Sequence, residues 1–217
     1  NGDYPKIFAD LLGSHGIELT TIDVSADPLP DLHACDGWLI SGSADSVYDT
    51  LPWIPAMEDF IRRALAEPVP LVGICFGHQL VAQALGVTVA KADSGWGVGA
   101  IDYEFVDTSP TWMQPPPTGT VRLLASHQDQ VPELPEGADL LARAPRCPIA
   151  GYRIGRHALC IQPHPEFTKP RSRGLVERRL ERIGAERSAE ALGSLDEPLD
   201  ADLVAGWIAA FYRGLIR

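Results

Sequence analysis

Apolar and polar positions along the chain follow two periods, one typical of strands and the other of helices. Residues 17–24 (IELTTIDV) and 36–41 (DGWLIS) predict strands. Residues 54–67 predict a helix, because their apolar side chains recur every three or four positions, and Pro68 and Pro70 end it. The apolar run that follows, VPLVGIC, predicts a buried strand. A buried strand between helices indicates a three-layer α/β fold, in which helices flank a mostly parallel central sheet.

The segments after this strand continue the alternation. Residues 76–86 (FGHQLVAQALG) predict a short helix that Gly86 closes. Short strands are predicted at residues 98–105, 120–127 and 138–144. Residues 149–167 predict a hairpin that turns near Gly155 and ends in the unusual stretch QPHPEF.

The C-terminal region is predicted to be helical. Residues 170–193 carry Arg and Glu at helical spacing, which favours a solvated, ion-paired helix face over a binding site. The last stretch has an amphipathic stripe typical of a packing helix, formed by Leu203, Trp207, Ile208, Phe211 and Leu215. No repeat or low-complexity segment divides the chain, so residues 1–217 are predicted to form one domain.

The N-terminal residues have the pattern of a helix, not that of the first strand of a sheet. The chain begins at Asn1 rather than at a methionine, and residues 2–16 predict a helix that Gly16 ends. We therefore expect an N-terminal strand to be missing from this chain.

The composition and net charge limit the classes of protein to which the chain can belong. With 45% hydrophobic and 22% charged residues, the 217-residue chain matches ordinary globular domains. Its net charge of -11 disfavours a general nucleic-acid-binding surface, because phosphates would be repelled. No apolar run approaches the ~20 residues that cross a bilayer, and the N-terminal sequence does not resemble a secretory signal. We expect a cytoplasmic protein without a membrane partner.

The four cysteines are predicted to be free thiols in a reducing compartment. They are Cys35, Cys75, Cys147 and Cys160, and they form no CxxC pair and no close Cys/His cluster. Neither a zinc site nor a disulfide scaffold is indicated. No metal or other cofactor is predicted.

Cys75 stands between the predicted buried strand and the helix, in LVGICFGHQL. A sharp strand-to-helix turn would project its side chain out of the sheet, and the helix N-terminus would favour the reactive thiolate. Gly73 and Gly77 fit a turn too tight for side chains on both flanks. These residues alone leave two interpretations, a catalytic nucleophile or a small buried residue at the end of a core strand.

A nucleophilic cysteine needs a base, and six histidines are available. His15, His33 and His157 lie at a predicted helix end, a loop and a hairpin turn, where a solvated histidine is the default. His78 lies in the first turn after Cys75, where it is better placed to pack or cap the helix than to reach back.

The two remaining histidines, His127 and His164, end strand-like runs, where sheet enzymes place functional groups. Pro163 and Pro165 stiffen the backbone around His164, and Glu166 is close enough to accept a hydrogen bond from its ring. A carboxylate in that position fixes the tautomer and stabilises the imidazolium. His164 is therefore the better candidate base, although His-Pro-Glu could also simply end a strand.

Taken together, GICFGHQL and QPHPEF resemble the signature of class I, triad-type glutamine amidotransferases. The resemblance is to stand-alone members similar to the amidotransferase domain of GMP synthase. LISGSADSVYD and ASHQDQV stand at the expected places, so the resemblance extends from residue 1 to about residue 170. It implies a mostly parallel sheet flanked by helices.

The resemblance also implies an activity and a triad. Cys75 would be the nucleophile, His164 the general base and acid, and Glu166 the orienting carboxylate. The family releases ammonia from the side-chain amide of glutamine through a γ-glutamyl thioester, which makes glutamine the implied substrate.

Attack of a thiolate on an amide carbonyl creates a negative oxygen that needs hydrogen-bond donors placed beforehand. The N–H of Phe76, at the start of the helix, can supply one. By resemblance, a second N–H near Gly42 or Ser43 completes this oxyanion hole, although these residues could also form an ordinary turn.

Substrate-binding residues are likewise implied by the resemblance. Gln79 would contact the amide or main-chain end of glutamine. Ser126, His127 and Gln128 match the family's Ser-His stretch that lines the same pocket, which makes His127 a pocket residue rather than the base.

The acceptor of the ammonia is not indicated by the sequence. The chain has no room for a fused synthetase domain and no SGGxDS-like or GxxxxGK[ST] phosphate loop, so any synthetase must be a separate protein. Two alternatives stay open. A γ-glutamyl peptidase or hydrolase would use the same triad, and a regulatory subunit would have a silent site.

Overall fold

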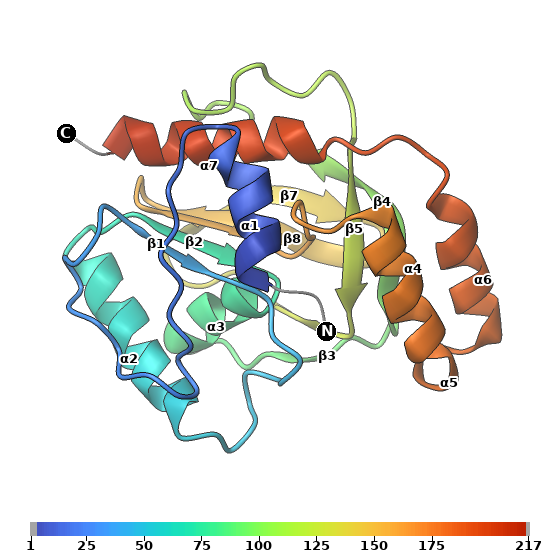
Figure 1. Cartoon of the computed structure of the whole chain (residues 1–217), viewed down its shortest axis with the longest axis horizontal. Coiled ribbons are helices and arrows are strands. Elements are labelled where there is room, and N and C mark those ends of the chain that lie inside the picture. Colours follow the sequence, from blue (N-terminus) through green and yellow to red (C-terminus); the bar gives the residue numbers. More distant parts are fainter. Residues whose placement is uncertain (1–3, 216–217) are drawn as a thin grey trace.

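The computed structural model describes residues 4–215, which form a curled β-sheet with helices against both faces (Figure 1). The helices are α1 (Tyr4–Gly13), α2 (Trp53–Ala66), α3 (Phe76–Ala84), α4 (Lys169–Arg178), α5 (Leu180–Ile183), α6 (Ala185–Ser194) and α7 (Ala201–Leu215). The strands are β1 (Trp38–Ile40), β2 (Leu71–Ile74), β3 (Ala90–Lys91), β4 (Gly97–Phe105), β5 (Val121–His127), β6 (Asp129–Gln130), β7 (Ala138–Ala144), β8 (Cys147–Ile154) and β9 (Ala158–Ile161).

Seven strands form the main sheet, in the order β1-β2-β9-β8-β7-β4-β5. Strands β1, β2 and β9 run parallel, whereas each later neighbour pairs antiparallel. Strands β3 and β6 pair separately. The expected α/β fold with helices flanking a central sheet is confirmed. The sheet is mixed, so the expectation of a mostly parallel sheet holds only for the part formed by β1, β2 and β9. The carboxyl ends of these three strands lie side by side.

The buried strand β2 has apolar contacts on both sides, as its uninterrupted apolar sequence requires. Val72 belongs to the core cluster with Phe8 of α1 and Trp207 of α7. Leu71, which faces the other way, belongs to the cluster with Ile61 of α2. Burial of such a side chain contributes about 1.5–3 kcal/mol relative to exposure. The two helical layers therefore fix the position of β2.

Most predicted elements are present within a few residues of their expected bounds. The helices expected at residues 54–67, at residues 76–86 and at the C-terminus are confirmed as α2, α3 and α7. The expected hairpin is β8–β9, and its turn contains Gly155 at a φ of 54°. Residues 4–13 of the predicted N-terminal helix form α1, whereas residues 2 and 3 lie outside the described residues.

The strand predicted at residues 17–24 is wrong, because most of that segment has no regular structure. Leu19 keeps 38% of its surface exposed, so the alternation of apolar and polar residues buries no face. Among the described strands, β1 forms that edge of the main sheet and none pairs with its outer side. An isolated strand without a partner is not stable in water.

The charged stretch at residues 170–193 is helical, and most of its Arg and Glu side chains are exposed, as predicted. It is divided into α4, α5 and α6, and Gly184, at a φ of 90°, separates the last two. Arg187 and Glu190 do form an ion pair at 2.8 Å. Arg179 and Arg182 instead line a pocket described below.

Over residues 4–215, no helix is both long and apolar enough to cross a bilayer.

Candidate active site

Three chain segments meet where the parallel strands end. Gly42 follows β1, Cys75 follows β2, and His164 follows β9. Parallel pairing places Ile40 beside Gly73 and Gly73 beside Cys160, so the carboxyl ends of these strands are adjacent. The candidate nucleophile, base and oxyanion donors therefore lie together at the carboxyl ends of these strands.

Cys75 lies on a sharp turn between β2 and α3. Its φ of 53° and ψ of -100° place a non-glycine residue at positive φ, and it is the N-cap of α3. A Cβ on Gly73 would lie 2.7 Å from the carbonyl carbon of Gly77. A Cβ on Gly77 would overlap the carbonyl oxygen of Ile40. Only glycine fits at both flanking positions, which supports the predicted elbow geometry.

His164 is held from several directions. Its Nδ1 lies 2.6 Å from Oε1 of Glu166, and both side chains are buried. Its ring stacks on Phe167 with the ring centroids 3.8 Å apart. The backbone N–H of His164 donates to the carbonyl of Leu124 in β5 at 2.8 Å. The imidazole is therefore fixed in position, and its Nε2 is the nitrogen that Glu166 leaves free.

The charges around His164 favour its protonated form. Burial alone would lower its pKa, but the charges of Glu166 and Cys75, together with the hydrogen bonds they form with the ring, raise the pKa of His164 well above its ordinary value. Both side chains lie next to Gly42. The arrangement suits an imidazolium near the cysteine with a buried carboxylate behind it.

Gly42 lies against both of these side chains. A Cβ at this position would lie 2.9 Å from Cε1 of His164 and 3.7 Å from Cβ of Cys75. The backbone after β1 can approach this closely because Gly42 has no side chain. On the other side of Cys75, Phe76 is the first residue of α3, so its N–H has no partner within the helix. The location of both groups is consistent with the predicted oxyanion hole.

A pocket of about 220 Å³ opens beside Cys75 and Phe76. Of the other sequence-predicted residues, the lining includes Ser43, Gln79, Ser126, His127 and Gln128. All predicted substrate-binding residues therefore lie around one cavity. Their role in binding stays a prediction.

Gln79 is buried and is anchored by its amide nitrogen. Its Nε2 donates to the carbonyl of Asp129 at 2.7 Å and to Oε1 of Gln162 at 3.0 Å. Both amide hydrogens are therefore used within the protein. Only the side-chain carbonyl oxygen of Gln79 is left to meet a ligand.

The two other histidines near the site are held neutral. Burial, and then the neighbouring His164, lower the pKa of His127 to about 3. Burial is also the main reason that the pKa of His78 falls to about 3. The His78 ring packs against Tyr152 with the centroids 4.8 Å apart, and its backbone carbonyl accepts the Tyr152 hydroxyl at 2.6 Å. Neither histidine is suited to act as a base near neutral pH.

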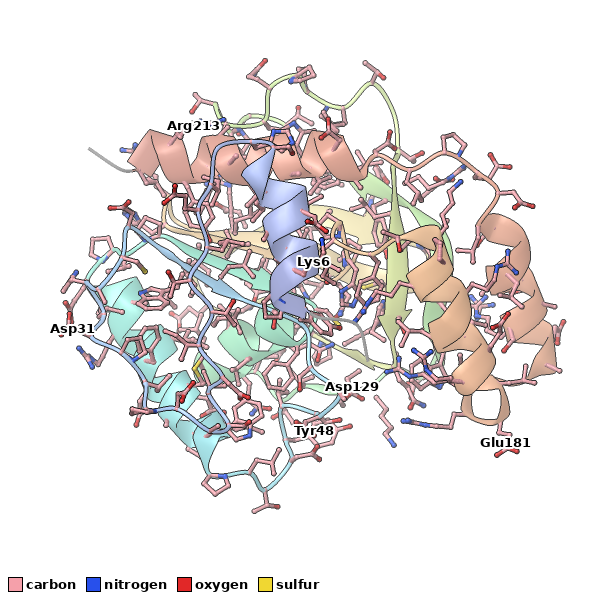
Figure 2. The ribbon with its side chains drawn as sticks, viewed as in Figure 1. Lys6, Asp31, Tyr48, Asp129, Glu181 and Arg213 are labelled. Atoms are coloured by element: carbon pink, nitrogen blue, oxygen red, sulfur yellow. The ribbon has the colours of Figure 1, made fainter. Side chains whose placement is uncertain are left out.

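Several pocket residues were not predicted. Asp129, on β6, accepts hydrogen bonds from the hydroxyls of Ser46 at 2.7 Å and Tyr48 at 3.0 Å (Figure 2). These bonds attach the loop after β1 to the opposite rim. Arg179 and Arg182 line the pocket from the α4–α5 junction, and no local motif distinguished them from surface arginines.

The fold and site together define an α/β protein with a cysteine on a strand-to-helix turn and a buried His–Glu pair beside it. The chain belongs to the class-I glutamine amidotransferase family, whose model matches residues 3–180. The resemblance predicted from the two motifs is therefore confirmed, and the chain is a member of an enzyme family.

Relatives and solved structures agree with this assignment. The chain is 34% identical to "Gamma-glutamyl peptidase 4" of Arabidopsis thaliana over 82% of this chain and 74% of that protein. It is 31% identical to a GMP synthase (glutamine-hydrolyzing) of Paraburkholderia phymatum over 84% of this chain and 35% of that protein. A crystal structure of a glutamine amidotransferase from Methylobacillus flagellatus has the same fold, with a TM-score of 0.76 and 24% identity over 98% of this chain and 89% of that one.

Proposed function

We propose that this protein hydrolyses the γ-amide bond of glutamine through a thioester on Cys75 and releases glutamate and ammonia. The observation that carries the proposal is the position of Cys75 at positive φ on the elbow, beside the buried His164–Glu166 pair. Membership of the class-I glutamine amidotransferase family supports the same chemistry.

In the first half of the reaction, the Cys75 thiolate attacks the γ-carbonyl carbon and a C–S bond forms. The carbonyl oxygen becomes an oxyanion, for which the N–H of Phe76 and an N–H near Gly42 or Ser43 are the proposed donors. His164 then gives its proton to the amide nitrogen. The C–N bond breaks, ammonia leaves, and a γ-glutamyl thioester remains on Cys75.

In the second half, neutral His164 takes a proton from water, and the hydroxide attacks the thioester carbonyl. The C–S bond breaks, glutamate leaves, and the thiolate–imidazolium pair is restored. Throughout, Glu166 accepts a hydrogen bond from Nδ1 of His164 and stabilises its positive charge.

A γ-glutamyl peptidase is the second candidate function. Its reaction differs only in the leaving amine, which is an amino acid or peptide instead of ammonia. The 34% identity to a protein named a γ-glutamyl peptidase favours this candidate. A catalytically silent regulatory subunit, in contrast, would not need a strained cysteine with a charged His–Glu pair.

The cellular setting of the reaction is part of the proposal. In this proposal, residues 1–217 belong to one glutamine amidotransferase domain, and the ammonia passes to a synthetase or acceptor protein. The four cysteines are free thiols, which supports a reducing compartment such as the cytoplasm.

Covalent labelling tests the nucleophile and the substrate class together. A glutamine analogue with an electrophile at the γ position is expected to modify Cys75, as measured by mass spectrometry of peptides. Burial raises the pKa of both Cys147 and Cys160 to about 12, so neither should react. Cys35 is exposed and serves as an internal control for undirected alkylation by iodoacetamide. Glutamine should slow the modification of Cys75 only; a label on Cys35 alone, or no protection by glutamine, would contradict the proposal.

The Glu166→Gln variant is expected to change the pH profile. The imidazolium form of His164 exists below its pKa, which the charge of Glu166 raises. Without that charge the pKa of His164 falls, so the alkaline limb of kcat/KM should move to lower pH. The maximal rate should also drop by about 10²- to 10⁴-fold.

Measuring kcat/KM between about pH 5 and pH 10 checks this prediction. Glu177→Gln, on the exposed side of α4, is the matched control and should leave the profile unchanged. An alkaline limb that stays in place in Glu166→Gln would show that His164 is not the titrating acid.

A further inference from the structure

Arg179 and Arg182 form a pair of cations at the rim of the pocket that contains Cys75. Both guanidinium groups lie over the ring of Trp96, with their central carbons 5.6 and 5.3 Å from its centroid. The ring holds both cations on one side of the pocket. Arg179 is further fixed by a 2.7 Å hydrogen bond from its Nη1 to the hydroxyl of Ser126.

No acidic side chain neutralises these two cations. Within residues 4–215, neither arginine forms an ion pair with a carboxylate, whereas Arg187, on the next helix, pairs with Glu190. Glu181, which stands beside Arg182 in the sequence, points out to solvent from the exposed turn of α5 (Figure 2). In a chain with a net charge of -11, two neighbouring cations without a carboxylate are available for an anionic ligand.

The electrostatic energy of the pair Arg179 and Arg182 is unfavourable without an anionic ligand, because their like charges repel. Burial lowers the pKa of Arg179, and the like charge of Arg182 lowers it further. Both groups nevertheless stay charged near neutral pH, since arginine titrates far above it. A bound carboxylate would relieve this repulsion and accept hydrogen bonds from the planar donors.

Other residues of the pocket already suit the head of an amino acid. The lining includes Asp45 and Asp49 from the loop after β1, and also Lys91 and Asp129, which face each other across the β3–β6 pair. Those carboxylates fit an α-ammonium group, and Lys91 fits an α-carboxylate. When Lys91 holds the α-carboxylate, glutamine has no second anionic group for the arginine pair, because its leaving group is neutral ammonia.

We propose that Arg179 and Arg182 bind the carboxylate of the leaving amine, so that the preferred donors are γ-glutamyl amino acids or short γ-glutamyl peptides with a free carboxylate. This inference rests on the proposed thioester chemistry of Cys75, and it favours the γ-glutamyl peptidase candidate over glutamine hydrolysis. The glutamyl head lies against Lys91 and Asp129, Cys75 attacks the γ-carbonyl, and the released amine lies against the arginines.

Binding to a Cys75→Ala protein tests the arginine site without turnover. Isothermal titration compares γ-glutamylglycine with γ-glutamylglycinamide, which differ only in the terminal carboxylate. We expect the carboxylate ligand to bind about 10- to 100-fold more tightly, the effect of a charged hydrogen-bond partner at a partly buried site. Adding Arg179→Gln and Arg182→Gln should remove this preference, whereas adding Arg178→Gln, on the exposed face of α4, should keep it.

Kinetics on the protein with Cys75 intact complete the test. The double arginine variant should lose about 10- to 100-fold in kcat/KM for γ-glutamylglycine but change little for glutamine. Equal binding of the two ligands by Cys75→Ala, or an equal loss for all substrates, would overturn the inference, because the arginines would then act on the glutamyl head or only support Ser126. Selective binding without hydrolysis by the intact protein would instead retain the carboxylate site and refute the proposed function.

Discussion

Replacing Cys75 with alanine is expected to abolish hydrolysis of glutamine and of γ-glutamyl peptides. The loss should be about 10⁴- to 10⁶-fold, because the proposed covalent intermediate forms on the thiol of Cys75. The other three thiols do not substitute for it, since Cys147 and Cys160 are buried and Cys35 is remote from the lining of the pocket. Glutamate release measured with the purified variant checks this result. Wild-type rates in Cys75→Ala would refute the role of this residue.

A Cys75→Gly variant separates the effect of losing the thiol from the effect of backbone strain at this position. It should be as inactive as Cys75→Ala but more stable by about 1 kcal/mol, because a φ of 53° disfavours any side chain and suits glycine. Urea unfolding of the two variants measures the difference. Equal midpoints would mean that the elbow stores no backbone strain.

Gly77→Ala is expected to have the largest effect on stability. The new methyl group would overlap the carbonyl oxygen of Ile40 in β1, and neither group is at the end of a flexible side chain. Either β1 or α3 must move, which should lower the free energy of unfolding by more than about 3 kcal/mol. Because Gly42 lies two residues after the end of β1, the same movement should reduce hydrolysis in any protein that still folds.

Gly193→Ala is the matched control for this prediction. Gly193 lies within α6, and a methyl group there would meet nothing within 4 Å. Alanine is the better helix former, so this change should raise stability by up to about 1 kcal/mol. Thermal unfolding of both variants gives the comparison, and a Gly77→Ala protein with wild-type stability would show that the elbow tolerates a side chain.

The parts of the candidate site that could be predicted are those whose residues lie close together in the sequence. The elbow requires a strand, two glycines and a helix within one short stretch, and QPHPEF places the histidine and its carboxylate two residues apart. Both stretches could therefore be interpreted before any tertiary contact was known. The contact of Gly42 with His164, in contrast, depends on pairing between distant strands.

One interpretation failed and another was incomplete, because tertiary contacts decided them. The alternation in residues 17–24 predicted a strand, but the described sheet offers that segment no partner. The arginines of residues 170–193 have the spacing of a solvated helix, yet the chain bends at Arg179 and brings two of them over Trp96. Helical periodicity does not reveal such a bend.

The parallel pairing of β2 with β9 also orders events during synthesis of the chain. Leu71 pairs with Ala158, so the strand that carries the nucleophile gains its neighbour only after much of the later sequence has left the ribosome. Until then, Cys75 has neither His164 nor a completed sheet beside it. The candidate active site is therefore complete only when the sheet closes around β9.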